Sequence, residues 1–135
     1  MTTRASGTFE VKLKPQAPDD KAQDATLVRM SFDKQFHGDL EAASQGHMLA
    51  FGTGAPGSSG GYVALERISG TLHGRSGTFV LQHSGTMTRG AMLMSATVVP
   101  DSGAGQLVGL TGTMTIQIAD GKHSYDFEYT LAPTP

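Results

Sequence analysis

The chain has 135 residues, of which 38% are hydrophobic and 16% are charged, and its formal net charge is −2. This length predicts one domain spanning 1–135, with its core at about 7–131. The weak charge excludes a basic patch for nucleic acid, and the lack of cysteine excludes disulfides, thiolate metal sites and cysteine nucleophiles. The sequence contains neither a long apolar run nor a secretory signal, so we expect a cytoplasmic protein without a membrane partner.

Alternating apolar and polar residues predict eight strands separated by turn-rich segments. The expected strands are 7–14, 25–36, 39–51, 61–72, 75–88, 91–99, 111–119 and 122–131. We expect a mobile lid at the glycine-rich segment 52–61 and at most one short helical turn near 105–109. An all-β, eight-stranded antiparallel closed barrel with minimal helix is favoured, because closure removes exposed sheet edges. A β-sandwich is the alternative, although sandwiches usually need longer crossovers.

The second expected hairpin contains the first polar candidates. A two-residue turn at His37-Gly38 would pair Lys34 with Glu41 as an ion pair near the barrel rim. The same register would place Gln45 and His47 on the face of Val28, Met30 and Phe32. If that face points inward, Gln45 and His47 become polar ligand contacts in the lumen.

The central hairpins fix the register of the best candidate site. Loops at His73-Gly74 and Arg89-Gly90 are typical of two-residue hairpin turns. The first loop pairs Glu66 with Leu81 and Ala64 with His83, so Glu66 and His83 become diagonal neighbours on adjacent strands. A slip of one residue would reverse both faces.

The face that carries Glu66 and His83 is otherwise apolar, so we expect it to line the lumen. Burial disfavours the charged form of a carboxyl group and raises its pKa, and a neighbouring imidazole can exchange its proton. Glu66 and His83 are therefore candidate acid–base catalysts, and a buried polar pair with a purely structural role is the alternative. The further ligand-contact candidates on this face are Tyr62, Phe79 and Met94.

The opposite face of these strands mixes aliphatic and polar residues. Val63, Leu65 and Val80 give it more aliphatic surface than a solvated strand needs. We expect this face to contact a second copy of the chain, which makes a homo-oligomer the expected assembly.

The last hairpin adds aromatic walls to the expected cavity. A turn at Asp120-Gly121 pairs Ile116 with Tyr125 and Gly112 with Tyr129. Tyr125 and Tyr129 could line the cavity and direct their hydroxyl groups at a ligand. Ordinary core tyrosines with satisfied hydroxyl groups are the alternative.

Metal and phosphate sites are not expected. The five histidines show no HxH or HxxxH spacing, and two of them fall at predicted turns. The segment 52–61 lacks the GK[ST] ending of a phosphate-binding loop. We therefore expect neither a metal nor a cofactor.

Long stretches of the chain resemble a known family. The runs GYVALERISGTLHGRSGTFVLQHSGTM, TVVPDSGAGQLVGLTGTM and DGKHSYDFEYTL, with the earlier FDKQFHGDLEAASQGHMLA, resemble the uncharacterised bacterial family DUF3224. The resemblance covers about 7–131 and implies an allene oxide cyclase-like β-barrel. It supplies no catalytic residues and no established activity.

Three functions remain open at this point. The first is a barrel that binds a small hydrophobic or hydroxylated metabolite beside Glu66 and His83. The second is a cofactor-free isomerase or cyclase that uses acid–base chemistry, with Tyr125 orienting the substrate. The third is a structural or protein-interaction barrel whose lumen is filled by its own side chains.

Overall fold

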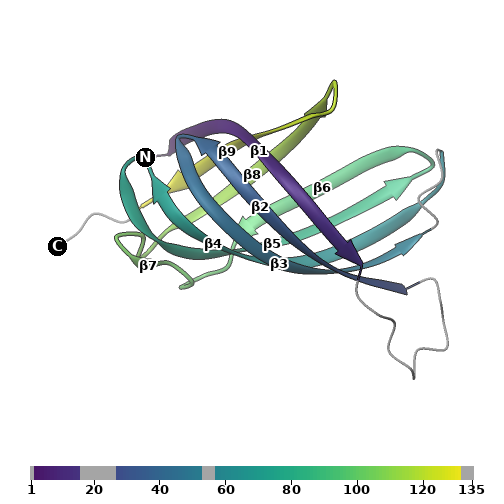
Figure 1. Ribbon diagram of the computed structural model, residues 1–135, viewed down its shortest axis with the longest axis horizontal. Helices are drawn as coiled ribbons and strands as arrows, with labels where there is room; N and C mark the ends of the chain where they lie inside the picture. Colours follow the sequence, from purple (N-terminus) through teal and green to yellow (C-terminus); the bar gives the residue numbers. More distant parts are fainter. Residues whose placement is uncertain (1, 16–26, 53–56, 132–135) are drawn as a thin grey trace.

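The computed structural model describes residues 2–15, 27–52 and 57–131, which form β-strands without any helix (Figure 1). The strands are β1 (Thr3–Pro15), β2 (Leu27–Gly38), β3 (Leu40–Gly52), β4 (Gly60–Leu72), β5 (Arg75–Thr88), β6 (Ala91–Val98), β7 (Ala104–Gly105), β8 (Thr111–Ala119) and β9 (Lys122–Thr130). Residues 53–56 of the expected lid at 52–61 lie outside the described residues. Over the described ranges, no helix is present that could cross a membrane.

Eight of the strands close into an antiparallel barrel. Their order around the wall is β1, β2, β3, β4, β5, β6, β8 and β9, and β9 pairs with β1 to complete the circle. The short β7 pairs with β5 alongside Gly77 and Thr78. The expected closed eight-stranded barrel is confirmed. The segment expected to form a helical turn near 105–109 instead makes two consecutive turns. The Leu107 N–H donates to the Ala104 carbonyl, and the Leu110 N–H donates to the Leu107 carbonyl.

Three hairpin registers follow the two-residue turns predicted from the sequence. Both residues of each turn have positive φ, at His73-Gly74, Arg89-Gly90 and Asp120-Gly121. This backbone is that of a type I′ turn, whose twist matches that of the flanking strands. Glu66 accordingly pairs with Leu81, and Ala64 with His83, as expected.

The expected register of the β2–β3 hairpin is wrong. Lys34 pairs with Ser44 instead of Glu41. The turn lies beyond His37-Gly38, at Asp39, whose carboxylate accepts from the Ser6 N–H at 3.0 Å and whose own N–H donates to the Ser6 carbonyl. The resulting shift of β3 relative to β2 is three residues. An odd shift reverses the two faces of a strand, so the β3 residues that were expected inside the barrel lie on its outer wall.

The two ends of the barrel differ in packing. At the packed end, which holds the β2–β3 and β4–β5 turns, Phe79 stacks on Phe127, and Leu107 and Leu110 are buried in the core. At the open end, β6 and β8 diverge, and only two residue pairs join them, Ala96 with Met114 and Thr97 with Thr113. Figure 1 shows the β8–β9 hairpin rising away from the β5–β6 hairpin.

The outer wall near the open end carries exposed aliphatic side chains. Val63 and Leu65 on β4 are 56% and 55% exposed. Val80 is half-buried, and its N–H donates to the hydroxyl group of Ser102 in the segment that follows β6.

Candidate functional site

A cluster of four polar side chains lies inside the barrel, one from each of four neighbouring strands. Glu66 on β4 is the centre of this cluster and has no solvent exposure. Its Oε1 accepts from His83 Nε2 on β5 at 2.7 Å and from Lys34 Nζ on β2 at 3.1 Å. Its Oε2 accepts from Ser44 Oγ on β3 at 2.5 Å. We call Lys34, Ser44, Glu66 and His83 the lumenal cluster.

Aromatic rings surround the ammonium group of the lumenal cluster. Lys34 Nζ lies 4.9 Å from the ring centroid of Phe9, 5.2 Å from that of Phe32 and 5.8 Å from that of Phe36. Desolvated cations are attracted to ring faces at these distances. The side chain of Lys34 is only 8% exposed. Glu66 and the three phenyl rings therefore replace most of the water that would otherwise solvate this cation.

The surroundings of Glu66 keep its carboxyl group ionised. Burial raises the pKa of Glu66, but the hydrogen bond from His83 and the charge of Lys34 oppose it, with a further contribution from Ser44. The net effect is a pKa below the usual range of a glutamate. The raised pKa expected from burial alone is therefore wrong, because the donors of three other strands stabilise the carboxylate.

A pocket of about 190 Å³ extends from the lumenal cluster toward the open end of the barrel. Lys34, His83 and His123 are its basic lining residues, and the rest of its wall is mostly apolar. The apolar lining includes Phe9, Val11, Phe32, Met48, Ala64 and Ile116. A ligand in this pocket would therefore lie against a mostly apolar wall, with the Lys34 ammonium and the His83 imidazole beside it.

Two glycines shape this half of the lumen. A Cβ atom at Gly46 would lie 2.2 Å from the Phe32 ring, and one at Gly85 would lie 2.5 Å from the Tyr62 ring. Both distances are too short for real side chains, so these rings can lie flat against the barrel wall only where glycine is present. The absence of two side chains thus lets two aromatic rings line the lumen.

Among the predicted ligand contacts on β4, β5 and β6, Tyr62 and Met94 lie together near the pocket, whereas Phe79 does not. Tyr62 lines the pocket, and its hydroxyl group lies 2.8 Å from the sulfur of Met94. Burial and the charge of Glu66 raise the pKa of the Tyr62 hydroxyl group. Phe79 faces inward as expected, but it lies in the packed half, stacked on Phe127.

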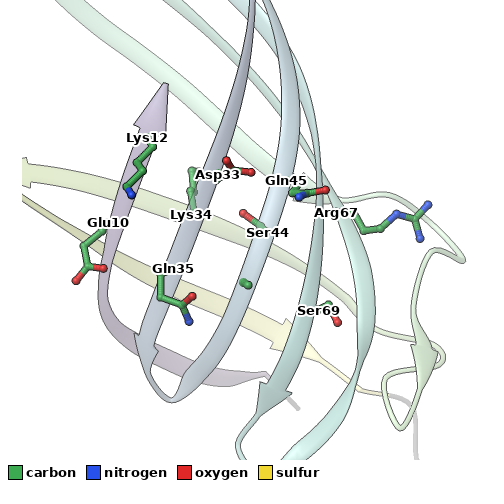
Figure 2. A pocket seen from close by; sticks show the side chains of 10 residues that line it. Glu10, Lys12, Asp33, Lys34, Gln35, Ser44, Gln45, Arg67 and Ser69 are labelled. Carbon is green, nitrogen blue, oxygen red and sulfur yellow. The ribbon is translucent and has the colours of Figure 1, made fainter. Parts of the chain in front are cut away.

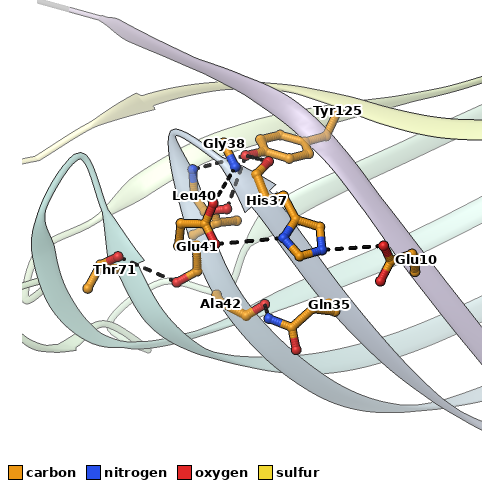
Figure 3. A network of polar contacts seen from close by, with 9 residues as sticks. All are labelled: Glu10, Gln35, His37, Gly38, Leu40, Glu41, Ala42, Thr71 and Tyr125. Carbon is orange, nitrogen blue, oxygen red and sulfur yellow. Dashed lines mark hydrogen bonds and ion pairs between the residues drawn. The ribbon is translucent and has the colours of Figure 1, made fainter.

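Tyr125 and Tyr129 direct their hydroxyl groups toward the packed end. The Tyr125 hydroxyl accepts from the Leu40 N–H at 2.9 Å and lies 3.0 Å from the His37 carbonyl, to which it can donate (Figure 3). Burial raises the pKa of Tyr125. The Tyr129 hydroxyl lies 2.5 Å from His73 Nδ1. Both hydroxyl groups are thus engaged with groups at the turns.

Gln45 and His47 lie on the outer wall, which corrects the inward placement expected for them. Both are exposed, whereas Ser44 and Gly46 between them are buried. Gln45 borders a polar groove of about 640 Å³ on the outside of the barrel, together with Lys12, Asp33 and Arg67 (Figure 2). This groove is larger than the lumenal pocket and is also bordered by Lys34 and Ser44, but Glu66 and His83 do not line it. We therefore place the candidate site in the lumen.

The sequence interpretation missed Lys34 and Ser44. The inward placement of Ser44 depends on the β2–β3 register, which the expected two-residue turn misplaced, and the same error paired Lys34 with Glu41. A usable signal was the alternation of β2, in which Lys34 shares a face with Phe32 and Phe36. A lysine between two phenylalanines on one face indicates a buried cation with a partner.

The described residues contain no group of three histidine, aspartate or glutamate side chains that could hold a metal ion. The cluster has one carboxylate and one imidazole, and an ammonium group occupies the space beside them. This arrangement favours organic ligands over metal ions.

Comparisons with known proteins agree with this fold. The profile of DUF3224, described as a protein of unknown function, matches residues 5–129. A crystal structure of a protein with unknown function from the DUF3224 family of Shewanella oneidensis MR-1 is 47% identical, with a TM-score of 0.88, over 98% of this chain and 100% of that one. Among curated proteins, the sequence finds no match. The chain therefore belongs to the DUF3224 family.

Proposed function

We propose that the protein binds a small, mostly apolar molecule in the lumen, with one oxygen atom of the ligand facing Lys34 and His83. The single observation that carries this proposal is the apolar pocket of about 190 Å³ that ends at a buried, ion-paired lysine. An empty apolar cavity of about 150 Å³ accommodates benzene. The ligand body is therefore expected to be close to one substituted ring in size.

The chemistry of Lys34 defines the polar end of this ligand. An ammonium group has three donor hydrogens, and its hydrogen bond to Glu66 uses one of them. A carbonyl or hydroxyl oxygen can accept another. A ligand carboxylate is disfavoured, since Glu66 already supplies a negative charge next to the same nitrogen.

The pocket also argues against the structural alternative. A barrel with a purely structural lumen is filled by its own side chains. Here the packed half meets that description, with Phe79, Phe127 and Tyr129 in ring contact, while the other half retains the pocket. The unfilled pocket leaves apolar side chains without packing partners, so a bound ligand would gain these contacts.

The binding proposal can be tested by filling the pocket. Ala64 lines it, and the adjacent Val63 faces outward on the same strand. Benzyl alcohol should raise the Tm of the wild type and of Val63→Phe, because a ligand that binds the folded state stabilises it. Ala64→Phe should abolish this rise. The proposal is wrong if benzyl alcohol and toluene leave the wild-type Tm unchanged, or if Ala64→Phe responds as Val63→Phe does.

A second candidate function is a cofactor-free isomerase or cyclase. It is favoured by the 2.7 Å contact between His83 and Glu66 at the end of the pocket. With Glu66 ionised, His83 becomes the group that moves a proton, and Glu66 holds its ring in place. Turnover of a bound compound that survives in His83→Gln would exclude this role.

A further inference from the structure

We propose that Lys34 forms an iminium bond with a small apolar aldehyde in the lumenal pocket. This inference rests on the proposed binding function and names a substrate class for the same site. Lys34 lines the pocket, and its side chain is 8% exposed. A ligand carbonyl that accepts from the ammonium group places its carbon next to Nζ, the atom with which it would react.

The surroundings of Lys34 suit the product as well as the free lysine. An ammonium group and an aldehyde give an iminium group and water, so the nitrogen carries one positive charge both before and after the reaction. Glu66, 3.1 Å from Nζ, remains the counter-ion, and the rings of Phe9, Phe32 and Phe36 remain around the cation. The environment that stabilises the ammonium cation therefore stabilises the iminium product as well.

The lumenal cluster also supplies the proton transfers that the reaction needs. Lys34 Nζ gives one proton to the Glu66–His83 pair, the neutral amine attacks the carbonyl carbon, and a second Nζ proton passes to the carbonyl oxygen to give a neutral carbinolamine. The resulting carbinolamine loses its hydroxyl group as water when a proton returns to it, and the C=N bond forms. The hydrogen bonds from Lys34 to Glu66 and between Glu66 and His83 connect the groups that exchange these protons.

The other described lysines lack this arrangement. Lys12, Lys14 and Lys122 are exposed, so water competes with any aldehyde for their nitrogens and reverses the dehydration step. In the pocket, the apolar wall concentrates an apolar aldehyde beside one nitrogen. Lys34 should therefore react first, although it is the least accessible of these lysines.

The test uses benzaldehyde as the probe and borohydride to trap the product. The intact protein is incubated with benzaldehyde at neutral pH and reduced, and the benzylated lysines are located by peptide mass spectrometry. We expect modification at Lys34 to exceed that at Lys12 and Lys122 by at least about tenfold. Lys34→Arg keeps the charge beside Glu66 but cannot form the iminium, and it should show only the surface background.

Benzyl alcohol is the control that distinguishes the iminium inference from the binding proposal. It matches benzaldehyde in size but cannot form a C=N bond, so it should protect Lys34 from modification in competition. If benzyl alcohol binds and Lys34 is modified no faster than Lys12, the iminium inference is wrong and the binding proposal stands. If neither compound binds and Lys34 is unmodified, both are wrong.

Discussion

Replacing Glu66 by glutamine should strongly destabilise the protein. The change keeps the shape of the side chain but removes the negative charge that faces Lys34 Nζ at 3.1 Å. Glu66 has no exposure and the Lys34 side chain is 8% exposed, so water cannot replace the lost partner. Breaking a buried ion pair from one side costs about 3–5 kcal/mol.

This cost is a large fraction of the total stability of a domain of this size. Folded domains are typically stable by about 5–15 kcal/mol, so Glu66→Gln should still fold at room temperature. Its Tm should fall by roughly 10–20 °C. The free energy of unfolding is measured by urea titration followed by circular dichroism, and Tm by scanning calorimetry.

A surface variant and a double variant separate the buried pair from general effects of charge. Glu10→Gln removes an exposed carboxylate that lies 3.4 Å from His37, and it should cost at most about 1 kcal/mol. Adding Lys34→Met to Glu66→Gln removes the uncompensated cation, so the double variant should be more stable than the sum of the two single effects implies. The reasoning fails if Glu66→Gln lies within about 0.5 kcal/mol of Glu10→Gln.

Two further predictions concern titration and the packed end. The folded-state pKa of Glu66 is lowered below the unfolded value of about 4.3, so the unfolded chain binds more protons in acid than the folded chain does. The contribution of Glu66 to the free energy of unfolding is therefore complete above the unfolded pKa and is lost as the pH falls through the folded pKa. Urea titrations from pH 7 to pH 3 should therefore show that the free energy of unfolding falls more steeply with decreasing pH for wild type than for Glu66→Gln. Parallel plots of this free energy against pH would contradict the prediction. Tyr125→Phe leaves the Leu40 N–H without its acceptor and should lower the free energy of unfolding by about 1–3 kcal/mol. The affinity for benzyl alcohol, measured by calorimetry, should not change. A weaker affinity would mean that Tyr125 contacts the ligand.

The sequence by itself determined most of the barrel and half of its lumenal cluster. A two-residue turn such as His73-Gly74 fixes the pairing of every residue along both flanking strands, because the side-chain period of a strand is two. Local turn chemistry was therefore enough to place Glu66 and His83 together on one face. The same reasoning oriented Tyr125 inward.

Tertiary contacts decided the rest of the site. The β2–β3 turn is held by Asp39 bonding to Ser6 on β1, and this contact between distant residues accompanies the register that turns Ser44 inward and Gln45 and His47 outward. The pKa of Glu66 depends in turn on Lys34, Ser44 and His83, which come from three other strands. A turn motif determines the strand register of its own hairpin only. The surroundings of a buried charge depend on closure of the barrel, which brings donors from distant strands to it.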